Sequence, residues 1–312
     1  MNSLQKILVI VDEESPSAQS NAIQCAIRLA KRNNASIKLI DVIQAPPLAV
    51  KMYQGIMSAE DLTELVKEKR ATILSNLATA IKENNLDVSF EVLEGRQFIE
   101  VIRRVLIDEY DLIIKSAHPV EESFDSSDFH LIRKCPCPVW LIKESKFNPA
   151  HDILACVDLT QEESDEGKQL NRLIVDLAAT LAAMEGVSLH VLSCWSLYGE
   201  SMFKNMPSLG ISNDKLEHML EATDRERKRQ LQDILDNYKQ CPTHPHLIKG
   251  QATDCIPEFI NNHQFSTVVM GTVGRTGLPG FLIGNTSETV LSRIDSSVIT
   301  VKPDGFETPV KQ

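Results

Sequence analysis

The chain has 312 residues, about twice the usual length of one domain, so we expect two domains. Hydrophobic residues make up 43% of the chain and charged residues 24%, a globular balance that excludes a disordered polymer. The formal charge of −11 repels polyphosphate chains, and no basic stripe offsets it. Bulk nucleic acid is therefore not an expected partner.

The N-terminal residues predict a first strand instead of an export signal, because a short apolar run is followed at once by acidic residues. No apolar run approaches the ~20 residues of a membrane span. The seven cysteines are an odd number, which favours reduced thiols over a disulfide framework. From these features we expect a cytoplasmic protein without a membrane span.

In the first half, short β-branched apolar runs alternate with longer segments of helical period. This alternation predicts crossover units of a mainly parallel α/β sheet. Strands are expected at 6–12, 36–43, 87–93, 110–115 and 138–143, and helices at 17–33, 59–84, 97–109 and 123–134.

The second half repeats the first. ILVIVD at 7–12 returns as ILACVD at 153–158, and PVWLIK at 138–143 returns 159 residues later as SVITVK at 297–302. A duplication with small insertions accounts for the spacing. Strands are expected at 152–158, 187–193, 244–248, 266–270 and 297–302, and helices at 164–185, 213–239, 252–263 and 286–294. The polar, aperiodic stretch near Lys146 sets the predicted domains at 1–146 and 147–312.

A glycine-bearing segment follows the fourth strand of the second copy. It contains Gly271, Gly274 and Gly284, and an apolar helical run follows. Glycines let the backbone approach a ligand, and a helix start offers amide groups and a partial positive charge. The segment therefore suits a phosphate group. Its cation and its hydroxyl and amide donors are Arg275, Thr272, Asn285, Thr286 and Ser287.

Two ordinary explanations compete with a phosphate site. The segment Gly-Leu-Pro-Gly at 277–280 could be a plain turn. Asn285 and Glu288 could form a capping box that already satisfies the helix start.

The spacing of Gly271, Gly274 and Gly284, together with HLIRKCPCPVWLIK at 130–143, resembles the universal stress protein family in its tandem, two-domain form. The resemblance covers essentially the whole chain. It implies a Rossmann-like fold, related to the nucleotide-binding alpha-hydrolase folds, with five strands and helices on both faces in each domain. It also implies binding of ATP or ADP, with Mg²⁺ as a companion ion, and it places Asp158 beside the adenine and ribose.

The two copies depart from the family pattern to different degrees. In the second copy Asn285 stands where the family has Ser or Thr, which leaves other phosphorylated ligands open. In the first copy Ser116 and Pro119 replace the glycines, and a proline lacks the amide N–H that a phosphate cradle uses. We therefore expect the first domain to be degenerate for ligand binding, with Asp12 as the counterpart of Asp158.

The family also implies that the last strands of its domains pair across a twofold axis. Here Pro138–Lys143 and Ser297–Lys302 could pair within one chain, giving an intramolecular pseudo-dimer, and a further homodimer remains open.

No kinase, P-loop or nucleophile-elbow motif is present, and no carboxylates or histidines show metal-ligand spacing. We therefore expect neither catalytic residues nor a resident metal. The family resemblance implies a stress-response role in binding or signalling. The alternatives are a slow ATPase or phosphotransferase at the same loop, and an interaction scaffold without a ligand.

Overall fold

The computed structural model describes residues 4–44, 58–117, 124–161, 164–205, 212–272 and 284–311. In the first half, strands alternate with helices: β1 (Lys6–Ile10), α1 (Asn21–Asn33), β2 (Ser36–Ile43), α2 (Ala59–Lys82), β3 (Val88–Glu94), α3 (Gln97–Asp108), β4 (Leu112–Ser116), α4 (Ser126–Lys134) and β5 (Val139–Ile142).

The second half repeats this order with an added short helix, α6. Its elements are β6 (Asp152–Cys156), the 3-10 helix η2 (Leu159–Gln161), α5 (Asp165–Glu185), β7 (Leu189–Trp195), α6 (Glu200–Asn205), α7 (Asn213–Leu235), β8 (Thr243–Lys249), α8 (Ala252–Asn261), β9 (Phe265–Gly271), α9 (Asn285–Leu291) and β10 (Ser297–Val301).

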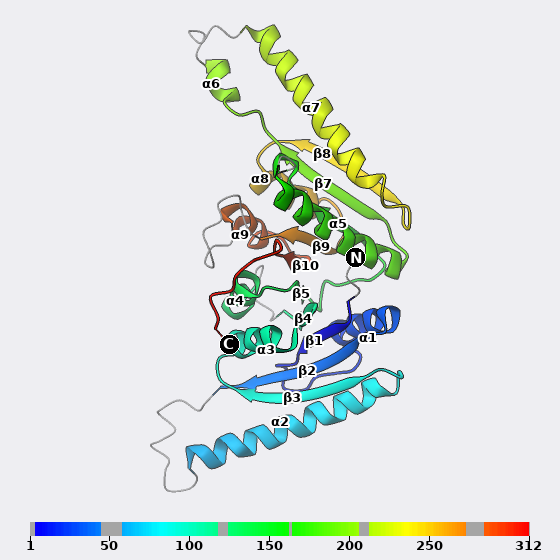
Figure 1. Cartoon of the computed structure of the whole chain (residues 1–312), viewed down its shortest axis with the longest axis vertical. Coiled ribbons are helices and arrows are strands. Elements are labelled where there is room, and N and C mark those ends of the chain that lie inside the picture. The colour runs from blue at the N-terminus through cyan, green and yellow to red at the C-terminus, as the bar shows by residue number, and fades with distance from the viewer. Residues whose placement is uncertain are drawn as a thin grey trace.

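The ten strands form one sheet in the order β3-β2-β1-β4-β5-β10-β9-β6-β7-β8. Neighbours within each half are parallel, whereas β5 and β10 pair antiparallel, with Trp140 opposite Ile299. The last strands of the two halves, β5 and β10, therefore lie side by side at the centre of the molecule (Figure 1).

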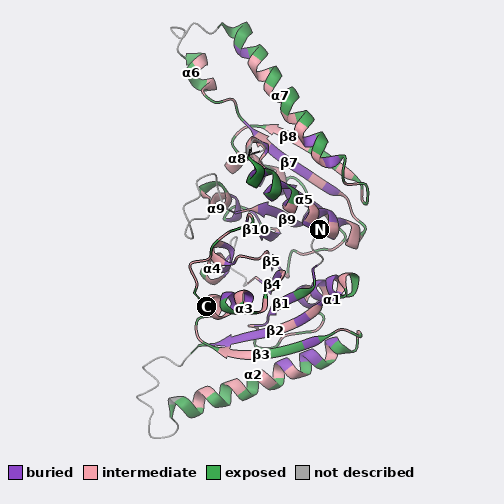
Figure 2. Ribbon diagram, viewed as in Figure 1, coloured by how far each residue is buried: buried purple, intermediate pink, exposed green. Residues whose placement is uncertain are grey.

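Two apolar clusters cover the two faces of this sheet. One contains the buried faces of α1, α2, α5 and α7, and the other those of α3, α4, α8 and α9. Each cluster contains strands of both halves, so the core is continuous across the central strand pair. Burial is highest on the central strands (Figure 2).

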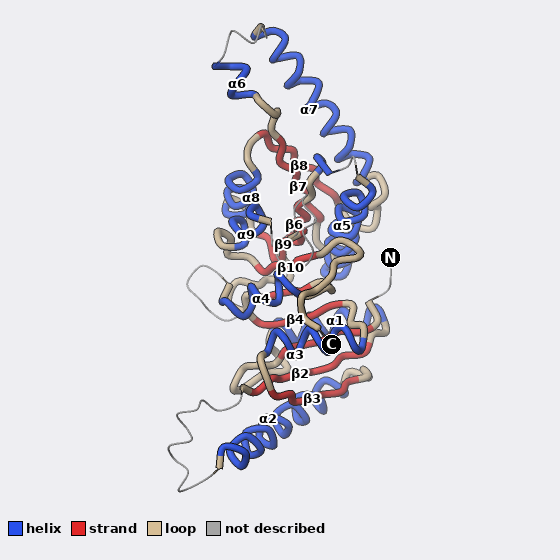
Figure 3. The backbone as a smooth tube through the Cα atoms, turned by 60° about the vertical axis from the view of Figure 1, so that its left-hand side comes forward, coloured by secondary structure: helices blue, strands red, loops and turns tan. Residues whose placement is uncertain are grey.

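The long helices α2 and α7 lie at opposite ends of the elongated molecule (Figures 1 and 3). The buried core residues of α2 lie in its C-terminal half, from Leu74 to Ile81, whereas Leu65 is 53% exposed. A helix needs only one apolar stripe to dock on a sheet, and here only part of α2 has one.

Candidate functional site

The residues predicted to bind a ligand lie at the carboxyl ends of two neighbouring strands. β6 and β9 are parallel, with Cys156 opposite Met270. Asp158 and Thr272 each follow two residues later, so both lie at the same edge of the sheet. In open α/β sheets, this edge is where ligands bind.

Gly271 ends β9, and its lack of a side chain has a packing cause. A Cβ atom there would lie 3.1 Å from Cδ2 of Leu170 and 3.5 Å from Cδ1 of Ile174, both on α5. Its backbone is not left-handed. Gly271 therefore allows α5 to pack closely on the strand.

Thr272 is fully buried at this edge. Its hydroxyl accepts a hydrogen bond of 2.6 Å from Nζ of Lys302, and its carbonyl accepts one of 2.8 Å from the amide of Gly284. Thr272 thus connects β9, the end of β10 and the start of α9. Its hydroxyl is engaged by the protein itself.

The helix α9 begins without a side-chain cap. Gly284 is the N-cap residue, with φ −62° and ψ 139°, and has no side chain that could accept from the first amides. Amide groups in the first turn of a helix have no partner within the helix. Asn285 and Thr286 are exposed, whereas the Ser287 hydroxyl donates to the carbonyl of Gly271 at 2.9 Å. Gly274 and Arg275 lie outside the described residues.

The capping box considered in the sequence analysis is not formed, because the helix begins one residue earlier than that motif requires. Glu288 instead forms an ion pair with Arg133 of α4, in the other domain. This arginine partly neutralises an acid in the first turn of α9.

Asp158 leads from β6 into η2. Its Oδ1 accepts a hydrogen bond of 2.9 Å from the amide of Thr160, and it also accepts from the Thr160 hydroxyl. The backbone amide of Asp158 donates to Oδ1 of Asn171 on α5, and Nδ2 of Asn171 donates to the carbonyl of Asp158. Asp158 is therefore positioned by the turn that follows it and by α5.

At the corresponding edge of the N-terminal domain, a buried lysine and two carboxylates of that domain form ion pairs with one another. Lys115, at the position of Met270, is completely buried, with its Nζ 2.9 Å from Oδ1 of Asp128 and 3.3 Å from Oδ2 of Asp12. Although burial lowers the pKa of Lys115, the two carboxylates outweigh burial and raise the pKa overall. Asp12 also accepts from Gln97 at 2.8 Å.

The start of α4 differs from the start of α9 in one respect that bears on anion binding. Asp125, 159 residues before Gly284, is the N-cap of α4, and its Oδ1 accepts from the amide of Asp128 at 2.7 Å. A second carboxylate, that of Glu144, accepts a hydrogen bond of 2.9 Å from the Ser116 hydroxyl. It also accepts hydrogen bonds from the first backbone amides of α1. Pro119 lies outside the described residues.

Two buried lysines, 159 residues apart, directly follow the central strands β5 and β10. Nζ of Lys143 donates to the carbonyl of Ile294 and to Asp295, each at 3.1 Å, whereas Lys302 donates to the carbonyl of Ile132 and to Thr272. Each lysine thus reaches into the other domain. Burial lowers the pKa of Lys302 to about 8.

Sequence reasoning missed the internal roles of Lys115, Lys143 and Lys302. The available signal was a lysine within or directly after an apolar strand, as in LIIKS and VWLIK. Lysine is almost never fully buried unless it is paired, so each of these positions indicated a partner.

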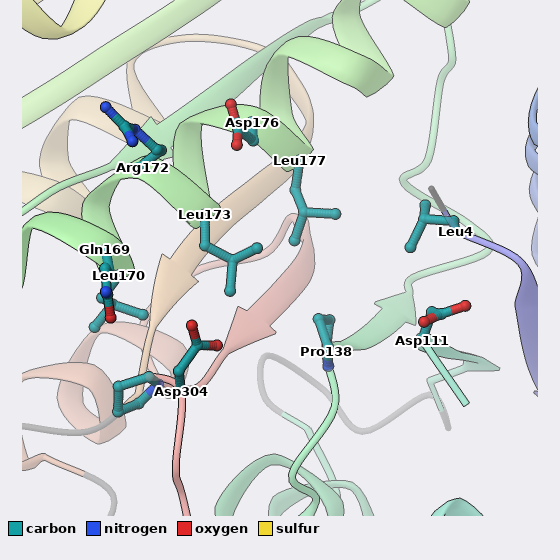
Figure 4. Close-up of a pocket in the computed structure, with 11 residues that line it drawn as sticks. Leu4, Asp111, Pro138, Gln169, Leu170, Arg172, Leu173, Asp176, Leu177 and Asp304 are labelled. Atoms are coloured by element: carbon teal, nitrogen blue, oxygen red, sulfur yellow. The ribbon is translucent and has the colours of Figure 1, made fainter. Parts of the chain in front are cut away.

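A cavity of about 310 Å³ lies between the two halves, under α5 (Figure 4). Leu173 and Leu177 point into it from α5, opposite Pro138. Its lining carries the acids Asp111, Asp176 and Asp304 against one arginine, so it does not suit a phosphate. Asp111 and Asp176 already accept hydrogen bonds, from backbone amides and from Tyr238 respectively.

Within the described ranges, no group of three or more histidine, cysteine, aspartate or glutamate side chains is arranged to hold a metal ion. No helix among these residues has the length and apolar character needed to cross a membrane.

Comparison with known proteins identifies relatives that align with the whole of this chain. The Universal stress protein E of Photorhabdus laumondii is 26% identical over 319 aligned residues, covering 100% of this chain and 99% of the relative. The Universal stress protein E of Escherichia coli K12 is 25% identical, covering 100% of this chain and 98% of the relative.

Solved structures share the same fold. A protein of unknown function from Pseudomonas aeruginosa PAO1 superposes with a TM-score of 0.72 at 25% identity, covering 97% of this chain and 94% of that one. A universal stress protein from Archaeoglobus fulgidus gives a TM-score of 0.60 at 17% identity, covering 97% and 99%. These neighbours confirm the predicted α/β fold class.

The sequence model of the Universal stress protein family matches two successive stretches, residues 3–143 and 150–302. The resemblance noted in the sequence is thereby confirmed, and the chain belongs to the universal stress protein family as a tandem of two such domains.

Proposed function

We propose that the C-terminal domain binds the phosphate groups of a nucleotide, ATP or ADP, at the edge formed by Asp158, Gly271 and the start of α9. The protein would then act in the stress response by binding or signalling, through the change that the ligand induces. Seven unpaired cysteines support a reducing compartment such as the cytoplasm.

One observation carries the proposal: the two copies differ in what occupies the helix start. In the N-terminal domain the Asp125 carboxylate caps α4, and Lys115 neutralises the acids beside it. In the C-terminal domain Gly284 leaves the first turn of α9 uncapped by a side chain, and Met270 stands in place of the lysine. Amides at a helix start favour an anion.

The test transfers the N-terminal arrangement into the C-terminal domain. In Gly284→Asp, the new carboxylate should accept from the amide of Ser287, as Asp125 does from Asp128, and should repel phosphate. With Mg²⁺-ATP or Mg²⁺-ADP at about 100 times the dissociation constant, the wild type should gain about 2.7 kcal/mol in the free energy of unfolding. The variant should fold and gain nothing.

Asp125→Gly is the matched control, since it removes the corresponding carboxylate from the other domain and should leave the nucleotide effect unchanged. Nucleotide-induced stabilisation retained in folded Gly284→Asp would refute this site. A changed nucleotide effect in folded Asp125→Gly would show that the N-terminal domain takes part in binding. Product formation above buffer in a single turnover would favour the ATPase or phosphotransferase alternative.

A further inference from the structure

Two thiols meet at the carboxyl end of β7, in the C-terminal domain. Cys194 lies on β7, one residue before the strand ends at Trp195, and Cys255 lies in the first turn of α8. The helix α8 packs on β7, and a hydrogen bond joins the two thiols. Both cysteines are partly accessible to solvent, so a small molecule can reach the pair.

The turn between β8 and α8 is shaped to hold the sulfur of Cys255. A Cβ atom at Gly250 would lie 2.4 Å from Sγ of Cys255, so a larger residue would displace the thiol. The amide of Gly250 donates to the carbonyl of Trp195 at 2.9 Å, which fixes this turn against the residue after Cys194. The backbone therefore places the Cys255 sulfur beside the end of β7.

The N-terminal domain has the same turn without the thiols. There Glu100 lies over Gly95, where an added Cβ atom would be 2.9 Å from Cγ of Glu100. The registers of β2 and β7 against the first strand of each domain place Val42 at the position of Cys194. The arrangement that brings two thiols together thus belongs to the C-terminal domain.

The surroundings of the two thiols give them different roles toward an oxidant. Burial, followed by the neighbouring Cys255, raises the pKa of the Cys194 thiol to about 12, so Cys194 by itself is a poor nucleophile. Cys255 lies at a helix start whose N-cap residue, Gln251, makes no side-chain cap. A helix start favours negative charge on a side chain in its first turn. Cys255 is therefore the thiol that reacts first.

We propose that Cys194 and Cys255 form a modification site for hydrogen peroxide, which converts the pair to a disulfide. The Cys255 sulfur attacks one peroxide oxygen, the O–O bond breaks, and the departing hydroxide takes the thiol proton and leaves as water. The Cys194 sulfur then attacks the sulfenic acid on Cys255. The S–S bond forms, the S–O bond breaks, and the second hydroxide leaves as water with the proton of Cys194. Two thiols are oxidised and one peroxide is reduced to two waters.

The second step needs no reactive thiol in solution, because the partner sulfur is already in place. Proximity within the folded protein compensates for the small thiolate fraction of Cys194. The disulfide would join the first turn of α8 to the end of β7. Asp254, the residue before Cys255, pairs with Arg293 just after α9, with Nη1 and Oδ1 3.0 Å apart, so the modified turn is linked to that helix.

The experiment treats the reduced full-length protein with dilute hydrogen peroxide, blocks the remaining thiols with an alkylating agent, and maps the peptides by mass spectrometry. The wild type should yield a cross-linked peptide pair that contains Cys194 and Cys255, has lost two hydrogens, and separates after treatment with a dithiol reductant. A disulfide between Cys194 and its buried neighbour Cys156 would overturn the proposal. So would Cys194 and Cys255 that remain alkylated as free thiols.

Single variants test the order of the two steps. Cys194→Ser should stop at a sulfenic acid on Cys255, which dimedone traps, whereas Cys255→Ser should leave Cys194 as a free thiol under the same exposure. Cys135→Ser/Cys137→Ser is the matched control, because it removes the thiol pair at the end of α4 and should form the disulfide as the wild type does. Circular dichroism checks that the variants fold. A dimedone adduct on Cys194 in Cys255→Ser, or loss of the disulfide in the folded control, would contradict these roles.

Discussion

At the scale of single residues, the main difference between the two domains is the side chain that follows the fourth strand's apolar run. Lys115 is buried between two carboxylates, whereas Met270 stands at the corresponding position of the other domain. A buried lysine is tolerated only when its charge is compensated. The acids at this edge of the N-terminal domain are therefore partners of the lysine, and an added phosphate would have to compete with them.

We predict that Lys115→Met lowers the free energy of unfolding by about 3 to 5 kcal/mol, because it leaves the buried carboxylate of Asp128 and the partly buried one of Asp12 without their cation. Urea unfolding of the full chain, followed by circular dichroism, measures the change. Lys38→Met is the control. It breaks a partly exposed pair with Glu91, with Nζ and Oε2 3.1 Å apart, and should cost about 1 kcal/mol or less. Similar losses in the two variants would contradict the assigned role of Lys115.

The sequence predicted which residues end the strands, but not which side chains they contact. Gly271, Gly284 and Asp158 could be placed at one edge because the carboxyl ends of parallel strands meet there. The bonds of Thr272 to Lys302 and of Glu288 to Arg133 join positions 30 and 155 residues apart. Contacts between elements so far apart depend on tertiary packing, which local periodicity does not encode.

At the scale of elements, periodicity located the strands and long helices well, and their ends less well. The strand predicted at 36–43 is Ser36–Ile43, whereas the helix predicted at 213–239 ends at Leu235. The short helix Glu200–Asn205 was not predicted. It contains no buried residue, so it lacks the apolar stripe on which helix prediction depends.

Strand β7 and the edge strand β8 carry a cluster of histidines. Nδ1 of His190 lies 2.9 Å from Nε2 of His246, and the other ring nitrogen of His190 is 3.3 Å from Asp152 on β6. The ring of His244 is 4.8 Å from that of His190, and His263, after α8, is 6.5 Å from His246. Burial, followed by the neighbouring histidines, lowers the pKa of His246 to about 4.

The lowered pKa of His246 predicts that the protein loses stability in mild acid. An unfolded histidine titrates near 6.5, so between about pH 6.5 and 4 the unfolded chain binds more protons than the folded one. The free energy of unfolding should therefore fall with pH in this window. Allowing for the partial exposure of His246, we expect its share to be about 1 to 2 kcal/mol. Urea unfolding at pH 7 and pH 5 measures the change.

His246→Gln should reduce this loss, since glutamine does not titrate. His218→Gln, at an exposed position of α7, should leave the pH dependence as in the wild type. A wild-type pH dependence in His246→Gln would show that the acid sensitivity arises elsewhere.

At the scale of the whole molecule, the central pair β5 and β10 makes one sheet and one core out of two domains. Val139–Ile142 is completely buried, as is Ser297–Val301, so neither domain can separate without exposing an apolar strand edge. An exposed apolar edge favours aggregation. Each domain therefore depends on its neighbour for the cover of its last strand.

From this arrangement we predict that the two domains unfold together. The chain has two tryptophans, Trp140 on β5 and Trp195 on β7, so each domain contains its own fluorescent probe. In the single-tryptophan variants Trp195→Phe and Trp140→Phe, urea unfolding should give the same fluorescence midpoint as circular dichroism of the same variant, since coincident transitions indicate one cooperative unit. Thr300→Pro removes a backbone donor from β10, opposite Val139, and should separate the two midpoints because proline disrupts a central strand. If the fluorescence and circular dichroism midpoints already differ in variants with an intact β10, the domains are independent units that only touch, and the continuous core would contribute little to their stability.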